Sequence, residues 1–217
     1  MFKRLLFTAI VLSFCGIAFA QDRWIWPDEH IKDALFLQIG VGPKIEAGLV
    51  VATDPAFFDF DLKGGLAYQI GAAVNVHIAN HPSLKPQGIG RWGLEIEAIY
   101  GLRGFKAGNQ SMAMKCLEVP ILLQFYINKK LQVEAGLTPV KHIGVTPEYL
   151  QTGEVVANVG NIKGNDVMVS AGVCYKTAIG LVIGLRYNLG MSEWAENFHS
   201  KTNTAMLSAS YLFPIVK

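Results

Sequence analysis

The sequence predicts an all-β fold: a single closed, antiparallel transmembrane β-barrel of about eight strands with up-and-down topology. Three observations lead to this prediction. The N-terminus has the pattern of an export signal, the remaining chain alternates between apolar and polar residues, and short connections alternate with longer ones. Each alternating segment has about the length of a tilted membrane-spanning strand, which is roughly 9 to 11 residues.

Residues 1–20 have the three parts of a cleavable signal peptide. Lys3 and Arg4 give the start a positive charge, and an apolar run follows at 5–14. That run is too short for an uncleaved anchor, because a membrane-spanning helix needs roughly 20 apolar residues. The small–x–small pattern at 18–20 predicts cleavage after Ala20. Export combined with a barrel predicts the bacterial cell outer membrane as the location.

The mature chain is expected to hold a short N-terminal extension at 21–34 and one barrel domain at 35–217, since no glycine-rich or proline-rich linker divides it. Hydrophobic residues make up 51% of the sequence and charged residues 17%, yet no run long enough for a membrane-spanning helix follows residue 20. A barrel that exposes apolar side chains to lipid explains this composition. Loss of Lys3 and Arg4 leaves a formally neutral chain, which argues against a nucleic-acid partner.

The alternation is clearest at 117–127, where one face of the expected strand is apolar. That face consists of Leu117, Val119, Ile121, Leu123, Phe125 and Ile127. The opposite face, which we expect to point into the barrel, consists of Glu118, Pro120, Leu122, Gln124 and Tyr126. Polar groups collect on the inner face because the hydrocarbon outside requires apolar side chains.

Seven further segments show the same period, at 35–50, 66–78, 92–103, 131–138, 167–176, 179–189 and 205–213. The inward positions expected in the first three are Gln38, Gly40, Gly42, Lys44 and Glu46, then Gln69, Gly71, Ala73, Asn75 and His77, then Gly93, Glu95, Glu97, Gly101 and Arg103. Those expected in the last four are Gln132, Glu134, Gly136 and Thr138, then Met168, Ser170, Gly172, Cys174 and Lys176, then Gly180, Val182, Gly184, Arg186 and Asn188, then Ser208 and Ser210.

Connection lengths support the up-and-down order. The periplasmic turns of such a barrel are short and its outer loops are longer. Residues 128–130 and 176–178 read as tight turns, whereas the outer loops expected at 142–165 and 190–204 are long. The connection at 79–91 is longer than the rule predicts, and the outer loop after the segment 92–103 is short.

Six charged residues are expected to share the barrel interior: Glu95, Glu97, Arg103, Glu118, Glu134 and Arg186. An eight-stranded barrel is only just wide enough to be filled by side chains, which favours a salt-bridged plug that holds the interior together. The alternative is a gated polar pore or a small-ligand site that uses the same residues. Pro120 removes a ladder donor next to Glu118, so we expect a local irregularity in that strand.

No catalytic or metal-binding pattern accompanies these charges, so we expect neither an enzyme nor a cofactor or metal site. The five histidines are scattered, and none is placed with a serine or cysteine at a recognisable catalytic spacing. Cys116 and Cys174 fall in segments that we expect to be non-adjacent, which argues against a disulfide between them.

Most of the mature chain resembles the PorT-like outer-membrane β-barrels that are common in Bacteroidetes. The matching stretches are GLEIEAIYG at 93–101, LEVPILL at 117–123, EAGL at 134–137 and GLRYNLG at 184–190. The chain departs from the family pattern where Cys116 replaces an aromatic residue and Val119 replaces isoleucine. The resemblance implies an outer-membrane barrel and suggests a link to protein secretion, but barrel motifs alone do not transfer a role.

Two functions from different classes are therefore expected. The first is a structural or interaction component of the outer membrane, which contacts lipid and meets a protein partner through its extracellular loops or periplasmic turns. The second is a small pore or a ligand-binding and transport barrel that uses the inward Glu/Arg cluster. Conductance in planar bilayers separates the two.

Overall fold

The computed structural model describes residues 35–53, 62–80, 88–107, 110–146, 164–177, 179–192 and 201–216. The predicted signal peptide and N-terminal extension lie outside these residues. None of the described residues forms a helix that is long and apolar enough to span a membrane.

The described chain is almost entirely β-strand, with one short 3-10 turn. The elements are β1 (Leu35–Thr53), β2 (Leu62–Asn80), η1 (Gly88–Arg91), β3 (Trp92–Ala107), β4 (Gln110–Glu118), β5 (Ile121–Tyr126), β6 (Leu131–Thr146), β7 (Asn165–Lys176), β8 (Leu181–Gly190), β9 (Lys201–Tyr211) and β10 (Phe213–Val216). Paired strands run antiparallel. Most strands pair with their neighbours in the chain, but β4 and β5 each pair with β3 and β6, and β10 pairs with β1.

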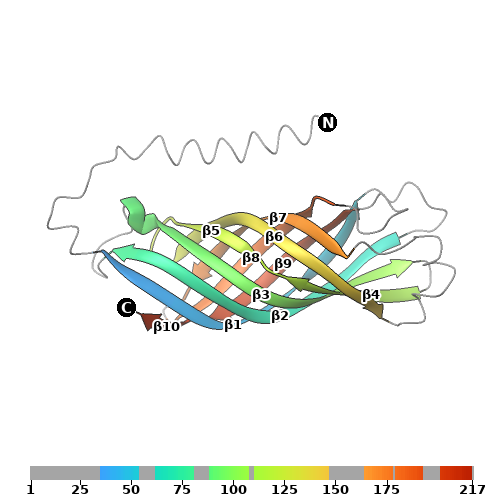
Figure 1. Cartoon of the computed structure of the whole chain (residues 1–217), viewed down its shortest axis with the longest axis horizontal. Coiled ribbons are helices and arrows are strands. Elements are labelled where there is room, and N and C mark those ends of the chain that lie inside the picture. The colour runs from blue at the N-terminus through green and yellow to red at the C-terminus, as the bar shows by residue number, and fades with distance from the viewer. Residues whose placement is uncertain are drawn as a thin grey trace, which may run out of the picture. The chain divides into compact units, whose positions relative to one another are not determined.

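The sheet closes because β1 pairs with β2 on one side and with β9 and β10 on the other. The ten segments form eight barrel strands, since β4 and β5 follow one another along one barrel strand and β9 and β10 along another. Figure 1 shows the tilted strands wound around a common interior. The predicted all-β fold, a closed antiparallel barrel of eight strands, is thus confirmed.

Val119 and Pro120 separate β4 from β5, where the sequence predicts an irregularity. Proline has no N–H to donate, so the regular ladder cannot continue through this position. Both neighbours nevertheless stay attached: Val119 N donates to the Pro139 carbonyl on β6, and Glu97 N on β3 donates to the Pro120 carbonyl, each at 3.0 Å. The barrel wall therefore remains hydrogen-bonded across the interruption.

The side chains alternate between an apolar outer face and a polar inner face, as predicted. In β8, for example, Ile183, Leu185 and Tyr187 are exposed, while Arg186 and Asn188 are buried. Lys176 is an exception, because we expected it inside and it is exposed. It is the last residue of β7, so its side chain leaves the wall at the turn instead of entering the interior.

Two strands extend further than the sequence suggested. β6 runs to Thr146 and β9 begins at Lys201, so parts of the expected outer loops at 142–165 and 190–204 belong to the barrel wall. The prediction failed there because polar residues such as His142, Thr202 and Thr204 read as loop residues. In the structure these side chains are buried on the inner face.

The two ends of the barrel differ in their connections. The turn at 127–130 and the connection between β7 and β8 lie at the end where β1 starts and β10 finishes, which we call the short-turn end. Gly180 has a φ of 89°, a conformation that glycine adopts readily, and its N–H closes the β7–β8 connection onto the Thr177 carbonyl at 3.2 Å. The opposite end, which we call the long-loop end, joins β6 to β7 and β8 to β9.

The apolar outer face makes a depth-dependent prediction. Leu185 is 58% exposed at the middle of β8, and Met191 is 51% exposed just beyond its end. In a membrane-spanning barrel we expect Leu185→Arg to lower the free energy of unfolding by about 2–4 kcal/mol, and Met191→Arg by about 0–1 kcal/mol. Urea unfolding in lipid vesicles, followed by the loss of heat-modifiable gel mobility, measures both values. Equal costs for the two variants would contradict a lipid-facing wall.

Candidate functional site

The inner face of the barrel carries the charged residues that the sequence predicts. All six are buried there: Glu95, Glu97, Arg103, Glu118, Glu134 and Arg186. Lys44 and Glu46, which the sequence places inward but outside this predicted set, are buried beside them. We call the following residues the central network: Lys44, Glu46, Glu95, Glu97, Glu134 and Arg186.

Arg186 is the centre of this network, because its guanidinium reaches carboxylates on three different strands. From β8 it donates to Glu97 on β3 through Nη2 at 2.6 Å and through Nη1 at 3.0 Å. Its Nε donates to Glu134 on β6 at 2.7 Å, and Nη1 lies 3.4 Å from Glu46 on β1. Since β8 and β3 are not neighbours in the sheet, the Arg186–Glu97 pair crosses the barrel interior.

Lys44 joins the network from β1. Its Nζ lies 2.7 Å from Glu97, 3.3 Å from Glu95 and 3.5 Å from Glu46. Buried ions lose their hydration, and their attraction offsets that cost only where geometry is good and further hydrogen bonds are made. Glu97 meets this condition, because Lys44 and both terminal nitrogens of Arg186 donate to it.

Neutral polar side chains continue the network toward the short-turn end. Gln124 Nε2 donates to Glu95 at 2.8 Å, and Asn75 Nδ2 donates to Gln124 Oε1 at 2.6 Å. The Tyr126 hydroxyl donates to the same Gln124 oxygen at 3.0 Å, and its ring stacks on His77 with ring centroids 3.9 Å apart. His77 in turn contacts a carbonyl of η1 at 2.9 Å. Side chains therefore link the central network to η1.

A second ion pair lies nearer the long-loop end. Arg103 Nη2 donates to Glu118 Oε1 at 2.6 Å, and the same oxygen accepts a hydrogen bond of 2.6 Å from Gln69 Nε2. The Cys116 thiol lies 3.2 Å from it. Glu118 is thus fixed by three partners at the last position of β4, directly before the Val119–Pro120 interruption.

Carboxylates outnumber cations in the described interior. Three cations, Lys44, Arg103 and Arg186, face six carboxylates there. Neutral donors supplement the cations: Gln124 also donates to Glu95, and the Cys174 thiol lies 3.4 Å from Glu134. Cys116 and Cys174 are both free, as the sequence predicts, and each thiol points at a glutamate.

Toward the long-loop end, several buried side chains have polar atoms without a hydrogen-bond partner among the described residues. We call them the outer polar group: Gln69, Arg103, His142, Asp166, Asn188 and Thr202. The unpartnered atoms include Nε and Nη1 of Arg103, both ring nitrogens of His142 and Oδ2 of Asp166. No atom of the central network belongs to this set. Buried polar atoms usually have hydrogen-bond partners, so the outer polar group differs from the central network in leaving donors and acceptors unpaired among the described residues.

Sequence reasoning missed three members of the outer polar group. His142 and Thr202 were assigned to loops, and Asp166 was not recognised as an interior residue. The available signal was the parity of β6 and β7: His142 lies four residues after the inward Thr138, and Asp166 lies two residues before the inward Met168. No cluster of three or more potential metal ligands occurs among the described residues.

The barrel is similar to solved structures of outer-membrane proteins. Ail, the attachment invasion locus protein of Yersinia pestis, is 16% identical with a TM-score of 0.42, and the alignment covers 82% of this chain and 97% of that one. The outer membrane enzyme PagL is 12% identical with a TM-score of 0.45 and coverages of 77% and 98%. A de novo designed transmembrane β-barrel is 13% identical with a TM-score of 0.37 and coverages of 79% and 95%.

At these identities the similarity concerns the fold alone. No protein-family model and no curated protein matches the chain. The resemblance to PorT-like barrels therefore stays a prediction.

The central network makes a prediction about stability. Replacing Arg186 with methionine retains much of the aliphatic part of the side chain but removes the guanidinium group that pairs with Glu134 and Glu97. Breaking a buried ion pair in this way is expected to lower the free energy of unfolding by about 3–5 kcal/mol. Urea unfolding of the vesicle-inserted barrel measures the change. The double variant Arg186→Met/Glu134→Gln should recover part of the loss, and no recovery would show that the charge of Glu134 is not what Arg186 balances.

Proposed function

We propose that this protein is an outer-membrane β-barrel with a plugged, salt-bridged interior, which acts as a structural or interaction component of that membrane. The closed sheet and its apolar outer face support a place in a lipid bilayer. The predicted signal peptide supports export, and an exported membrane barrel belongs in the bacterial outer membrane.

The observation that carries the plugged interior is the Arg186–Glu97 contact. Two short hydrogen bonds join side chains from non-neighbouring strands, and Lys44 binds the same carboxylate from β1. A continuous water channel would have to pass this crossing. The narrow interior of an eight-stranded barrel leaves little room for such a path.

The proposal includes no catalytic activity. The two thiols contact Glu118 and Glu134 and have no histidine partner among the described residues. His142, the buried histidine near the long-loop end, has no hydrogen-bond partner in the described chain that it could activate as a nucleophile. The expectation that the protein is not an enzyme is thus part of this proposal.

A protein partner would meet the barrel at its loops or turns, since the wall itself faces lipid. The sequence resemblance to PorT-like barrels suggests that such a partner takes part in protein secretion. The role in protein secretion is supported by the sequence resemblance alone, because a barrel fold does not specify a function.

Conductance in planar bilayers tests the plugged barrel. We expect the purified, inserted wild-type protein to give no stable single-channel current, because the central network closes the interior. Insertion is verified beforehand by the heat-modifiable shift of the same sample on gels. A stable current that Glu118→Ala abolishes would contradict the plug and support the transport alternative.

The ligand-binding alternative has a specific observation in its favour, which is the outer polar group. It offers donors on Arg103 and acceptors on Asp166 and Asn188 that no described residue satisfies. A small molecule that carries both an acidic group and hydroxyls matches this set, because carboxylates pair well with guanidinium donors.

Thermal unfolding with sugar acids tests this second candidate. Galacturonate at about a hundred times its dissociation constant should stabilise a binding barrel by about 2.7 kcal/mol, measured as an increase in Tm. The charge-balanced variant Arg103→Met/Glu118→Gln should lose the increase while it keeps its own heat-modifiable fold. No increase for the wild type with galacturonate, glucuronate or gluconate would argue against a sugar-acid site.

A further inference from the structure

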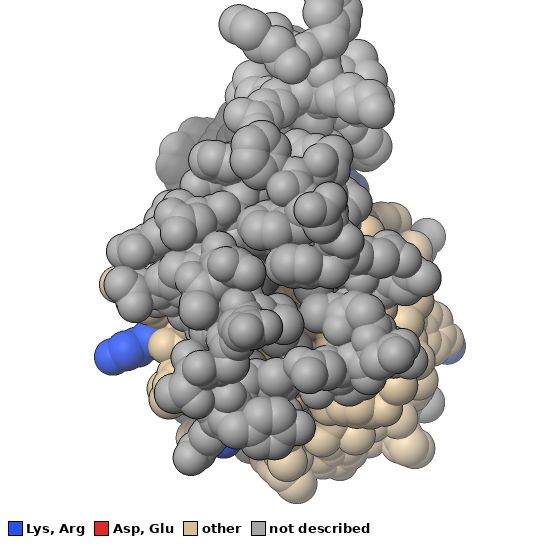
Figure 2. Space-filling view, turned by 90° about the vertical axis from the view of Figure 1, so that its right-hand side faces the viewer, with Lys and Arg blue, Asp and Glu red and all other residues tan. Residues whose placement is uncertain are grey.

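Acidic residues of the described chain lie only inside the barrel, whereas basic residues lie both inside and outside. All six aspartate and glutamate residues in the described chain are buried in the interior: Glu46, Glu95, Glu97, Glu118, Glu134 and Asp166. The charged side chains described outside the interior are all basic: Arg91, Lys115, Lys129, Lys130, Lys141, Lys176 and Lys201. In Figure 2 the described surface likewise shows basic residues and no acidic one.

Four of the outer basic residues gather at the short-turn end, next to the ends of β3, β5, β6 and β7. We call Arg91, Lys129, Lys130 and Lys176 the basic rim. Lys129 and Lys130 are exposed in the turn between β5 and β6, and Lys176 is exposed at the end of β7. The Lys176 N–H donates to the Lys130 carbonyl at 2.6 Å, which places these two residues side by side. Arg91, at the end of η1, lies over the ring of Phe125 at 5.8 Å from its centroid.

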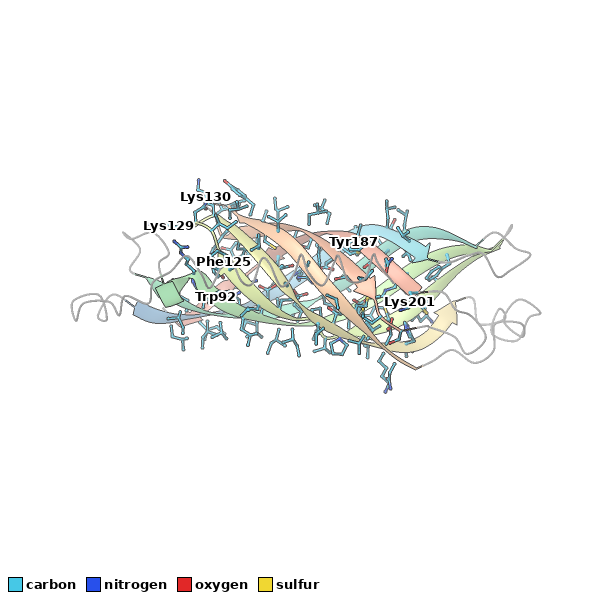
Figure 3. All side chains as sticks on the ribbon, turned by 90° about the horizontal axis from the view of Figure 1, so that it is seen from above. Trp92, Phe125, Lys129, Lys130, Tyr187 and Lys201 are labelled. Atoms are coloured by element: carbon cyan, nitrogen blue, oxygen red, sulfur yellow. The ribbon has the colours of Figure 1, made fainter. Side chains whose placement is uncertain are left out.

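Aromatic side chains border the basic rim on its membrane side. Trp92 and Phe125 face each other across β3 and β5, with their ring centroids 5.0 Å apart in an edge-to-face contact. Tyr175, one residue before Lys176, is 46% exposed. Figure 3 shows Trp92, Phe125, Lys129 and Lys130 together at one end of the barrel, away from Lys201. Tryptophan and tyrosine at such a position mark the interface between hydrocarbon and headgroups.

We propose that the basic rim binds the phosphate groups of anionic phospholipids in the adjoining membrane leaflet. The proposal rests on the proposed place of the barrel in a bilayer. Headgroup phosphates lie just beyond the aromatic level, which is the level of these four cations. Basic residues close to an anionic lipid surface are attracted to it, and no acidic residue of the described outer surface opposes this attraction.

Lipid fits this rim better than an acidic protein does. Exposed apolar side chains continue from the rim down the same strands, including Leu123 and Ile127 beside the turn and Val133 and Leu137 on β6. An occupant of the rim therefore has to match basic groups at the end of the barrel and an apolar wall directly below them. A phospholipid has this order of headgroup and acyl chain.

Tryptophan quenching by brominated lipids tests the proposal, because Trp92 lies beside the rim. The chain has four tryptophans, and the substitutions Trp24→Phe, Trp26→Phe and Trp194→Phe leave Trp92 as the single fluorophore. This variant is inserted into phosphatidylcholine vesicles that contain equal fractions of brominated phosphatidylglycerol or of brominated phosphatidylcholine. We expect about twofold stronger quenching by the anionic lipid at low salt, and a smaller ratio at high salt.

A matched pair of variants locates the effect. Lys129→Gln/Lys130→Gln should bring the quenching ratio close to one, whereas Lys115→Gln/Lys141→Gln removes the same charge nearer the long-loop end and should leave the ratio unchanged. Equal quenching by both lipids in the parent, a ratio that survives Lys129→Gln/Lys130→Gln, or a ratio lost in the control would overturn the rim proposal. Quenching by neither lipid would instead overturn the membrane location, so the two failures are distinguishable.

Discussion

The closure of the sheet between β1 and β9 is the constraint from which the other features follow. Inside hydrocarbon, every backbone N–H and C=O needs a partner within the protein, and an open edge would leave a row of them unpaired. The ten residue pairs from Lys44–Ser210 to Thr53–Lys201 remove that edge. Closure also fixes the alternation of side chains, because successive residues must face lipid and interior in turn. An interior made narrow by eight strands must then be filled with whatever the inward positions carry.

The contents of that interior divide into two parts with different physics. In the central network each carboxylate has a cation or a neutral donor within reach, so the loss of hydration is offset by direct contacts. In the outer polar group, by contrast, Nε and Nη1 of Arg103, both ring nitrogens of His142 and Oδ2 of Asp166 have no partner among the described residues, although all three side chains are buried. The proposed plug rests on the paired centre, and the ligand-binding alternative rests on the unpaired atoms nearer the long-loop end. This asymmetry connects the plugged barrel with its ligand-binding alternative.

The alternation of apolar and polar residues made the fold predictable, and it also showed whether most side chains point into the barrel or outward. A period of two follows directly from strand geometry. It also placed Glu97, Glu134 and Arg186 in one interior. Their partners were not predictable, since which inward residues meet across the barrel depends on the tilt and register of strands far apart in the sequence. Lys44 was assigned the correct face but not its place in the network for this reason. His142 was missed because a polar inward residue near a strand end looks like a loop in the sequence.

The sorting of charge connects the interior with the surface. A carboxylate inside can be matched by Arg186 or by an amide such as Gln124, whereas a carboxylate on the outer rim would face headgroup phosphates of its own sign. A lysine on the rim would be attracted to these phosphates, and its long side chain can extend from the apolar wall to the phosphate level. Cations are needed inside only where carboxylates must be bridged, as Lys44 and Arg186 do. On the proposed lipid contact, the same attraction between opposite charges accounts for both positions: carboxylates lie inside, where cations and amides contact them, and lysines lie at the rim.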